Sequence, residues 1–331
     1  MTGVFDFIPR AANHGLDALR TGAGAVGATL SAAGRDIMVS PPEHPIEGRD
    51  PDFITATLPL YRRVVDLYFR SEVRGLEHIP AEGPVLLVGN HSGGFYIADT
   101  FAFAYSFLSY FGAERRLHPL SHDVAMKLPA LSAVLRRYGG LPASNECAAR
   151  ALEIGAAVLV YPGGEVESFR PSSRSGAIDF ADRKGWIRLA LSHDVPIVPV
   201  VAIGGQETAL FLTRGRRLAQ LLQLDKLARL NVLPIQVGPP FGVTVLDLPA
   251  RFPLPAKLTL QVLPKVDLRA RFGEDSDERN VYETITAEMQ QALDDLAEER
   301  DLPLVGRVWS SARETHGSGR SRPPAEHTAQ T

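Results

Sequence analysis

The stretch LLVGNHSGGFYIADTF, residues 86–101, sets an apolar run against a glycine-rich turn that holds one histidine, and a second apolar run follows. Residues 85–88 have the pattern of a buried strand, and a helix is expected over residues 98–110. In α/β sheets, ligands bind in the loops beyond the carboxyl ends of strands. The stretch therefore predicts a strand–turn–helix unit that places His91 where chemistry can occur.

Strand and helix patterns alternate along the rest of the chain. Strands are expected at 85–88, 115–119, 157–161, 196–203, 231–237 and 257–263, and helices at 52–70, 98–110, 123–137, 144–154, 183–193, 215–224 and 277–299. This alternation predicts an α/β layered domain with a central mixed, largely parallel sheet flanked by helices. We expect that domain at 52–300, between an Ala/Gly/Pro-rich segment and linker at 1–51 and a largely disordered tail at 301–331.

The composition is that of a globular protein with a substantial core. The chain has 331 residues, of which 45% are apolar, and a formal net charge of -3, which disfavours a nucleic-acid binder. The single cysteine, Cys147, excludes an intrachain disulfide and suits a reducing compartment. No apolar run reaches the roughly 18 to 20 residues of a spanning helix. The start, MTGVFDFIPR, lacks the pattern of a secretory signal, so we expect no export.

His91 is the candidate general base. A histidine has an ordinary pKa of about 6.5 and can take a proton from an attacking hydroxyl at neutral pH. Asp99, at the start of the following helix, could fix the other ring nitrogen, or it could act only as a helix cap. The small residues of the Asn-His-Ser-Gly-Gly motif favour catalysis over a structural histidine.

Four segments resemble the conserved blocks of a known family. They are GNHSGGFYIAD, VLVYPGGEVESFRP, RKGWIRLAL and VPIVPVVAIGGQET, in this order between residues 72 and 268. Together they resemble the lysophospholipid acyltransferase superfamily, and within it the branch of diacylglycerol acyltransferase-like and phytyl-ester-synthase-like proteins. The resemblance implies a glycerolipid acyltransferase-like fold and transfer of a fatty acyl group from a thioester to a lipid hydroxyl. The thioester would be acyl-coenzyme A or acyl carrier protein, with no bound cofactor and no covalent acyl-enzyme.

The resemblance also implies roles for individual residues. It gives His91 the role of general base and Asp99 that of its partner, although the family spacing would place the aspartate at Tyr96. The three additional residues must bulge, and Gly93-Gly94 offers the place. The residues expected to bind substrate are Asn90, Ser92, Gly93, Gly94, Tyr161, Pro162, Gly163, Gly164, Glu165, Glu167, Arg170, Arg183 and Lys184. Backbone N–H groups of Gly163-Gly164 or of the histidine turn are expected to stabilise the oxyanion.

The second block departs from the family pattern Phe-Pro-Glu-Gly-Thr-Arg-Ser. Val166 stands at the position of the arginine that is thought to bind a phosphate in the family, and Gly163 stands at that of the glutamate. The nearby Glu165 and Glu167 would repel an anion. An uncharged acceptor such as a mono- or diacylglycerol or a long-chain alcohol is therefore favoured. Lysophosphatidate stays open, because Arg170, or Arg183 with Lys184, could replace the missing arginine or could simply form a solvated basic turn.

Metal and nucleotide sites are not expected. His118 and His122 lie four residues apart, but Pro119 argues against the helical face that such a ligand pair needs. The segment GAGAVG at 22–27 matches a nucleotide-binding pattern by letter, yet no strand precedes it.

A membrane surface is the expected partner, because the substrates dissolve in a bilayer. The helix at 53–69 and the stretch at 209–230, which contains Arg214, Arg216, Arg217, Lys226 and Arg229, are the candidate contact segments. Either could instead be an ordinary packed or surface helix. We expect a cytoplasmic protein that associates peripherally with the inner face of the membrane.

Two other functions stay open. A serine hydrolase is disfavoured because the chain contains no Gly-x-Ser-x-Gly nucleophile elbow. A non-catalytic lipid-binding module would leave the histidine and the displaced Asp99 idle, and its lipid binding would survive His91→Ala. An acyltransferase would instead lose at least about 100-fold in rate.

Overall fold

The computed structural model describes residues 44–94, 97–174, 176–223, 232–239, 241–245, 247, 252–274 and 277–300. Its strands are β1 (Glu72–Arg74), β2 (Val85–Gly89), β3 (Leu117–Ser121), β4 (Leu141–Pro142), β5 (Ala157–Val160), β6 (Ile197–Ile203), β7 (Leu210–Thr213), β8 (Ile235–Gly238), β9 (Gly242–Val245) and β10 (Thr259–Val262). Its α-helices are α2 (Pro51–Arg63), α3 (Ala98–Phe111), α4 (Asp123–Lys127), α5 (Pro129–Arg137), α6 (Asn145–Glu153), α7 (Gly164–Ser168), α8 (Gly185–His193), α9 (Arg216–Leu221), α11 (Leu268–Phe272) and α12 (Glu278–Glu298).

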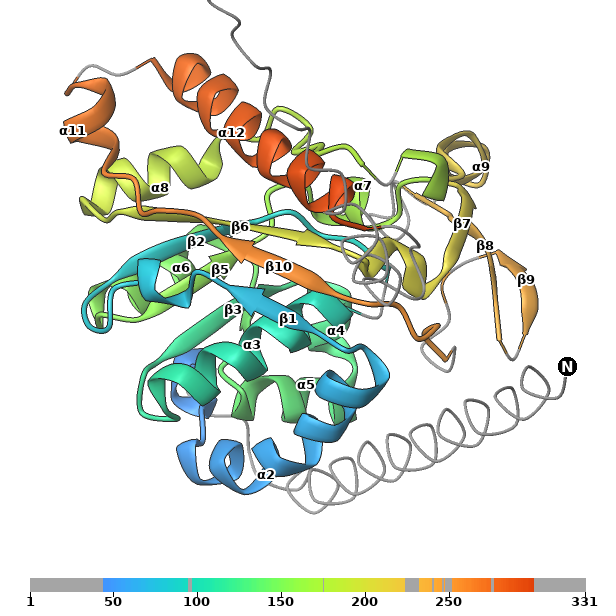
Figure 1. Cartoon of the computed structure of the whole chain (residues 1–331), viewed down its shortest axis with the longest axis horizontal. Coiled ribbons are helices and arrows are strands. Elements are labelled where there is room, and N and C mark those ends of the chain that lie inside the picture. Colours follow the sequence, from blue (N-terminus) through green and yellow to red (C-terminus); the bar gives the residue numbers. More distant parts are fainter. Residues whose placement is uncertain are drawn as a thin grey trace, which may run out of the picture.

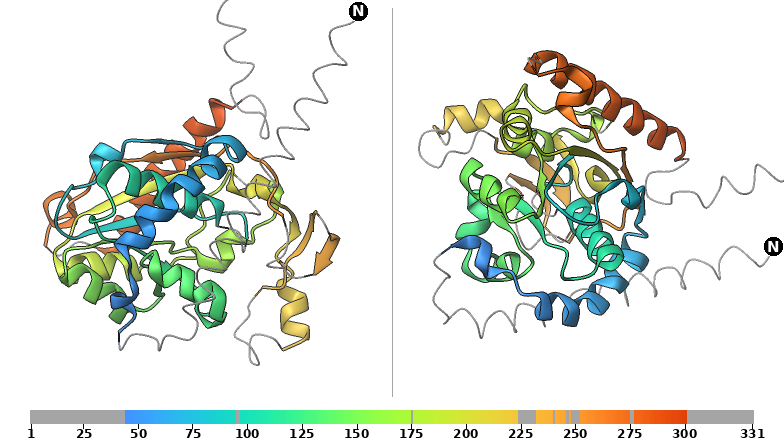
Figure 2. Two further views of the ribbon diagram at one scale, coloured as in Figure 1. Left: turned by 90° about the horizontal axis from the view of Figure 1, so that it is seen from below. Right: turned by 90° about the vertical axis from the view of Figure 1, so that its left-hand side faces the viewer.

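The central sheet has seven strands in the order β1-β10-β6-β2-β5-β3-β4 (Figure 1). Every neighbouring pair is parallel except β10 and β6, which run antiparallel. The predicted mixed, largely parallel sheet is thus confirmed. A second sheet of three antiparallel strands, β7-β8-β9, extends from one end of the main sheet (Figures 1 and 2).

Helices cover both faces of the main sheet, which explains why β2 is apolar throughout. All five of its residues are buried. Because successive side chains of a strand point to opposite faces, Leu86 and Val88 pack with α6, α8 and α12, whereas Val85 and Leu87 pack with α2 and α3. Figure 1 shows α8 and α12 on one side of the sheet and α2 and α3 on the other.

Proline and glycine account for several differences from the predicted elements. The helix expected at 123–137 is interrupted at Leu128, because Pro129 starts α5 and disfavours helical backbone in the residue before it. The helix expected at 52–70 begins at Pro51 as α2 and continues as a π-helical turn, Val64–Tyr68.

The stretch at 209–230, expected as one amphipathic segment, is a strand followed by a short helix. Residues 210–213 form β7, and Gly215, with a φ of 60°, separates it from α9. Residues 224–230 lie outside the described residues.

The end of the predicted linker is structured rather than irregular. His44 Nδ1 accepts the backbone N–H of Ile46 and begins a 3-10 helix at Pro45–Gly48. Asp50 then caps α2 and forms an ion pair with Arg137 at 2.8 Å. Residues 1–43, which include the segment GAGAVG, and the tail at 301–331 lie outside the described residues. The predicted domain limits of 52–300 therefore stay a prediction.

None of the helices within the described ranges is long and apolar enough to cross a bilayer.

Candidate active site

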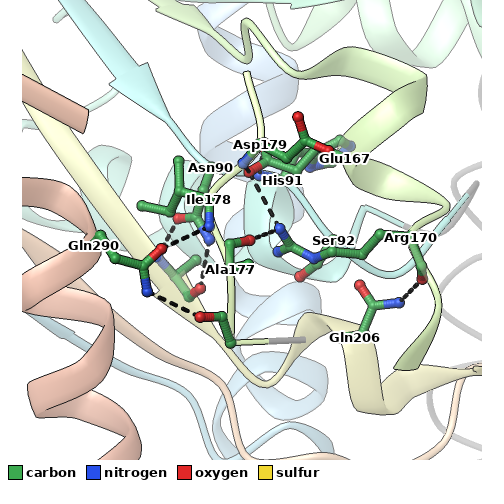
Figure 3. Close-up of polar contacts among 12 residues, drawn as sticks. Asn90, His91, Ser92, Glu167, Arg170, Ala177, Ile178, Asp179, Gln206 and Gln290 are labelled. Carbon is green, nitrogen blue, oxygen red and sulfur yellow. Dashed lines mark hydrogen bonds and ion pairs between the residues drawn. The ribbon is translucent and has the colours of Figure 1, made fainter. Parts of the chain in front are cut away.

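The candidate site lies where three neighbouring parallel strands, β5, β2 and β6, reach their carboxyl ends. The turn after β2 holds His91, α7 after β5 holds Glu167, and the turn after β6 holds Gln206. Figure 3 shows these three segments side by side. The carboxyl edge of a parallel sheet is the usual place for ligands in this fold class.

Asn90 fixes the start of the histidine turn. Its side-chain oxygen accepts the N–H of Ala202 at 2.7 Å, and its nitrogen donates to the carbonyl of the same residue at 2.9 Å. Through these two hydrogen bonds, the side chain of Asn90 continues the hydrogen bonding between β2 and β6 beyond the end of β2. Asn90 is therefore an anchor of the turn, whereas the sequence suggested that it contacts substrate.

Glycine is required in the turn itself. Gly93 and Gly94 have φ values of 94° and 71°, which L side chains rarely adopt. A Cβ on Gly94 would lie 2.3 Å from Asp247 Oδ2 and 2.5 Å from Phe211 Cζ. The left-handed pair lies in the part of the turn where the additional residues were expected to bulge.

The turn brings His91 and Asp99 together. His91 Nδ1 lies 3.2 Å from Asp99 Oδ1, in an ion-pair contact whose angle falls short of a regular hydrogen bond. The other carboxylate oxygen accepts the N–H of Ser92 at 3.0 Å, and Oδ1 also accepts the N–H of Thr100 at 2.7 Å. Asp99 thus bonds to both ends of the turn while facing the imidazole, whereas the N-cap position of α3 is Ile97, so Asp99 does not form the cap that the sequence allowed.

Tyr161 forms one wall of the site. Its ring stacks on the His91 imidazole, with 4.4 Å between centroids and 25° between planes. Its hydroxyl accepts a hydrogen bond from Thr100 Oγ1 at 2.8 Å. A Cβ on Gly89 would come within 2.6 Å of the tyrosine ring, so glycine at the end of β2 leaves the space that the ring occupies.

Glu167 accepts a hydrogen bond from the backbone of the histidine turn. It is fully buried, its Oε2 accepts the backbone N–H of His91 at 3.0 Å, and its Oε1 accepts that of Asp179 at 3.1 Å. The guanidinium of Arg170, also buried, lies 3.4 Å from Oε1. The backbone carbonyl of Arg170 in turn accepts a bond from Gln206 Nε2 at 2.6 Å (Figure 3).

This network surrounds two of the residues that were expected to bind the acceptor, and that role stays a prediction. Glu167 and Arg170 were expected to face the acceptor, but their charged groups are enclosed by protein and bind each other. The role of Glu167 as an anchor of the His91 backbone was not predicted. The spacing of three residues between an acid and an arginine was the available signal for their ion pair.

Buried charges determine the electrostatics of the site. Burial disfavours the charged imidazole, but the negative charges of Asp99 and Glu167 outweigh it and raise the pKa of His91. Burial also raises the pKa of Glu167 to about 7, against the opposing effect of Arg170. The imidazolium that forms on proton uptake is therefore favoured in this position.

The remaining predicted residues form the rim of the site. Arg183 Nη1 donates to the carbonyls of Pro162 and Gly163 at 3.1 and 3.3 Å, and Lys184 pairs with Asp182 at 2.7 Å. Both cations thus stabilise the turn after β5 and the start of α8.

Two more of the predicted residues, Glu165 and Ser92, carry side-chain oxygens. Glu165 lies 3.4 Å from the exposed ring of His122. Ser92 is buried beside Gly205, where a Cβ would come within 2.4 Å of the serine hydroxyl.

Four of the backbone N–H groups suggested for the oxyanion donate to protein acceptors. Those of His91 and Ser92 donate to the carboxylates of Glu167 and Asp99, as described above. That of Gly94 donates to the carbonyl of Ser168, and that of Gly164 to the carbonyl of Tyr161. These four groups therefore do not form an oxyanion hole in this conformation.

No group of three or more metal-binding side chains occurs within the described ranges. His118 is buried, and its Nδ1 lies 2.8 Å from the carbonyl oxygen of Gly139. Burial lowers the pKa of His118 to about 4, which keeps the ring neutral.

Comparison with known proteins identifies this arrangement. Residues 70–203, from the end of the π-helical turn to the end of β6, match the family model described as Acyltransferase. Residues 70–203 belong to the acyltransferase family. The matched segment contains the histidine turn, α7 and the glutamate anchor of this acyltransferase domain.

Relatives of the acyltransferase fall into three groups. An uncharacterized protein of Mycobacterium tuberculosis is 31% identical over 228 residues, which are 69% of this chain and 58% of that protein. The DGAT1/2-independent enzyme synthesizing storage lipids of Bos taurus is 29% identical over 129 residues, 39% of this chain and 37% of that enzyme. Phytyl ester synthase 2 of Arabidopsis thaliana is 31% identical over 142 residues, 40% of this chain and 19% of that enzyme. The chain thus spans less than two thirds of the length of each of these relatives.

Among solved structures, the 1-acyl-sn-glycerophosphate acyltransferase PlsC of Thermotoga maritima aligns with 84% of this chain and 95% of its own. The TM-score is 0.46 and the sequence identity 14%, so the family assignment rests on the sequence matches alone.

Proposed function

We propose that this acyltransferase moves a fatty acyl group from a thioester, acyl-coenzyme A or acyl carrier protein, to the hydroxyl of an uncharged lipid. The observation that carries the proposal is the 3.2 Å contact of His91 and Asp99 at the end of β2. Nδ1 faces the carboxylate, which leaves Nε2 as the nitrogen that can take a proton. The resemblance of the motif to those of lipid acyltransferases supports the same assignment.

The chemistry balances without a cofactor. His91 Nε2 takes the proton of the acceptor hydroxyl while the hydroxyl oxygen attacks the carbonyl carbon of the thioester. The π electrons of that carbonyl move to the carbonyl oxygen. Collapse of this tetrahedral species breaks the carbon–sulfur bond, and the imidazolium returns the proton to the leaving thiolate. Asp99 and Glu167 stabilise the imidazolium between the two steps, as their effect on the pKa of His91 indicates.

The charges near the site support an uncharged acceptor. Val166, which stands at the position of the family arginine, is buried on α7. Arg170 is paired with Glu167, Arg183 is bonded to two carbonyls and Lys184 is paired with Asp182, so protein groups already engage all three suggested replacements. A phosphate bound here would have to displace those partners, at a cost in desolvated charge.

The names of two relatives agree with this choice. The bovine enzyme is named for the synthesis of storage lipids and the Arabidopsis enzyme for phytyl esters. Such acceptors dissolve in a bilayer, so we propose that the protein works as a peripheral enzyme on the inner face of a membrane.

The test is acyl transfer from a long-chain acyl-coenzyme A to matched pairs of acceptors. Monoacylglycerol and diacylglycerol would be compared with lysophosphatidate in the same detergent micelles, and acyl carrier protein thioester would be tried as a second donor. We expect transfer to the uncharged lipids. Transfer to lysophosphatidate alone would contradict the argument about the acceptor, and absence of transfer with every donor and acceptor would favour a lipid-binding module.

A further inference from the structure

The three-stranded sheet β7-β8-β9 presents an apolar face to solvent. In its register, Leu210, Val237 and Val243 form one cross-strand row, and Thr213, Ile235 and Val245 form the next, in which only Thr213 is polar. The end residues of these rows are exposed, at 47% for Leu210 and 67% for Val243. Hydrocarbon side chains therefore line this side of the sheet.

The opposite face is partly polar, which inverts the usual pattern of a half-exposed sheet. Phe211, Gln236 and Thr244 form the row on that side. Gln236 is buried, and its Nε2 donates to Asp247 Oδ1 at 2.8 Å. A water-facing sheet would place such groups outside, so the outer face is suited to an apolar environment.

Further exposed apolar side chains lie on these strands and on the elements next to them. We call the exposed apolar residues of β7, β9, the turn before β9 and α9 the outer apolar face: Leu210, Leu212, Leu221, Phe241, Val243 and Val245. Leu221, on α9, is 78% exposed. Several large apolar side chains gathered on adjacent elements mark an interaction surface rather than scattered exposure.

The charges around the face select its partner. Arg216 and Arg217 are exposed on α9, and residues 209–223, 232–239 and 241–245 include no Asp or Glu. A surface that combines apolar side chains with exposed cations complements a bilayer with anionic headgroups. We propose that the outer apolar face docks on such a bilayer, with its apolar side chains among the acyl chains and these arginines at the phosphates.

The inner side of the same sheet contacts the histidine turn. The Phe211 ring lies 5.7 Å from that of Phe169, and Phe211 also limits the space at Gly94. Docking would therefore hold the bilayer on one side of a thin sheet and the His91 turn on the other. The proposal names the membrane-contacting surface of the enzyme proposed above, but it does not depend on acyl transfer.

The test is sedimentation of the full chain with vesicles, in the absence of substrate. Vesicles of phosphatidylcholine alone would be compared with vesicles that also contain phosphatidylglycerol. The double variant Leu212→Glu/Val243→Glu is expected to lose at least about 10-fold in partition to both, because two charges would enter the apolar layer. Arg216→Gln/Arg217→Gln is expected to lose about 10-fold with the anionic vesicles only, and added salt should remove the same part of the binding in wild type.

Two control variants separate this surface from the others. Ile154→Glu changes a residue that is 42% exposed beside α6, and Leu67→Glu changes one that is 66% exposed in the π-helical turn after α2. Both are expected to bind like wild type, and the thermal unfolding of each variant shows whether it is folded.

Three results would overturn the proposal. The first is unchanged vesicle binding by a folded Leu212→Glu/Val243→Glu protein, and the second is loss of binding in Leu67→Glu alone, which would assign the contact to the α2 region. The third is a wild-type dimer that the double variant splits while vesicle binding persists, which would make the face an interface between two copies. Loss of acyl transfer with vesicle binding intact would instead contradict only the proposed function.

Discussion

Replacing Asp99 with asparagine tests the electrostatic part of the mechanism, because it removes the charge and nearly keeps the shape. Asp99 Oδ1 lies 3.2 Å from His91 Nδ1, and their side chains are only 1% and 11% exposed. Two unit charges at this distance attract by about 5 kcal/mol at an effective dielectric constant of about 20. If about half of that attraction, roughly 2.5 kcal/mol, stabilises the imidazolium in the transition state, Asp99→Asn slows acyl transfer about 70-fold.

The same substitution changes the pH dependence in a defined direction. Burial opposes the imidazolium, but Asp99 first and Glu167 next raise the pKa of His91 above its ordinary 6.5. The base acts when it is unprotonated, so the rate of the wild type rises with pH through this raised pKa. Asp99→Asn lowers the pKa of His91, and the rising limb of the pH–rate profile moves to lower pH.

The assay is the rate of acyl transfer under kcat/KM conditions from pH 5 to 9, beside Asp66→Asn as a control. Asp66 is a surface carboxylate that pairs with Arg62 outside the site, so its replacement should leave both rate and profile unchanged. Thermal unfolding shows whether each variant is folded. A folded Asp99→Asn protein with the wild-type rate, or with a limb moved to higher pH, would refute the reasoning.

Three further predictions concern stability and packing. The pKa of His118 is about 4 in the folded protein and about 6.5 in the unfolded chain, so the free energy of unfolding decreases as the pH falls from 6.5 to 4. In urea unfolding, His118→Gln should reduce this decrease by up to about 3 kcal/mol. The same decrease in the variant as in wild type would contradict the prediction. Gly89→Ala would place a Cβ 2.6 Å from the Tyr161 ring, so calorimetry should show that the protein is about 1 to 3 kcal/mol less stable. Acyl transfer should also be slower, because Tyr161 stacks on His91. A variant as stable and as active as wild type would contradict this. Glu167→Leu leaves the buried Arg170 without its counter-charge and should lower the free energy of unfolding, measured in urea, by about 3 to 5 kcal/mol. Adding Arg170→Met should restore part of that stability. If the two substitutions lower the stability independently of each other, the two residues are not coupled.

The sequence predicted the long elements well, because each carries several periods of its hydrophobic pattern. The buried run of β2 and the helices α3, α8 and α12 lie within a few residues of their expected limits. The short elements β1, β4, α7 and α11 were missed because so few residues define no period, whereas the equally short β2 and β5 were found because each is an apolar run. The segment at 210–213 was assigned to an amphipathic stretch, although Gly215 breaks it and tertiary pairing with β8 makes it a strand.

The candidate site was predictable only in its local part. His91 and Asp99 are close in sequence, so one turn with two glycines brings them together. Glu167 reaches the His91 backbone across 76 positions of sequence, through the adjacency of β2 and β5 in the sheet. No local pattern encodes that contact, so the glutamate was assigned to the acceptor side instead of to the support of the turn.

The most direct test of the account is the rate of acyl transfer by His91→Ala, measured beside His193→Ala with the best uncharged acceptor. His193 lies at the end of α8, away from the site, and serves as a matched histidine control. We predict a loss of at least about 100-fold for His91→Ala and a wild-type rate for the control. A folded His91→Ala protein that transfers acyl groups at the wild-type rate would contradict the central claim that His91 is the general base.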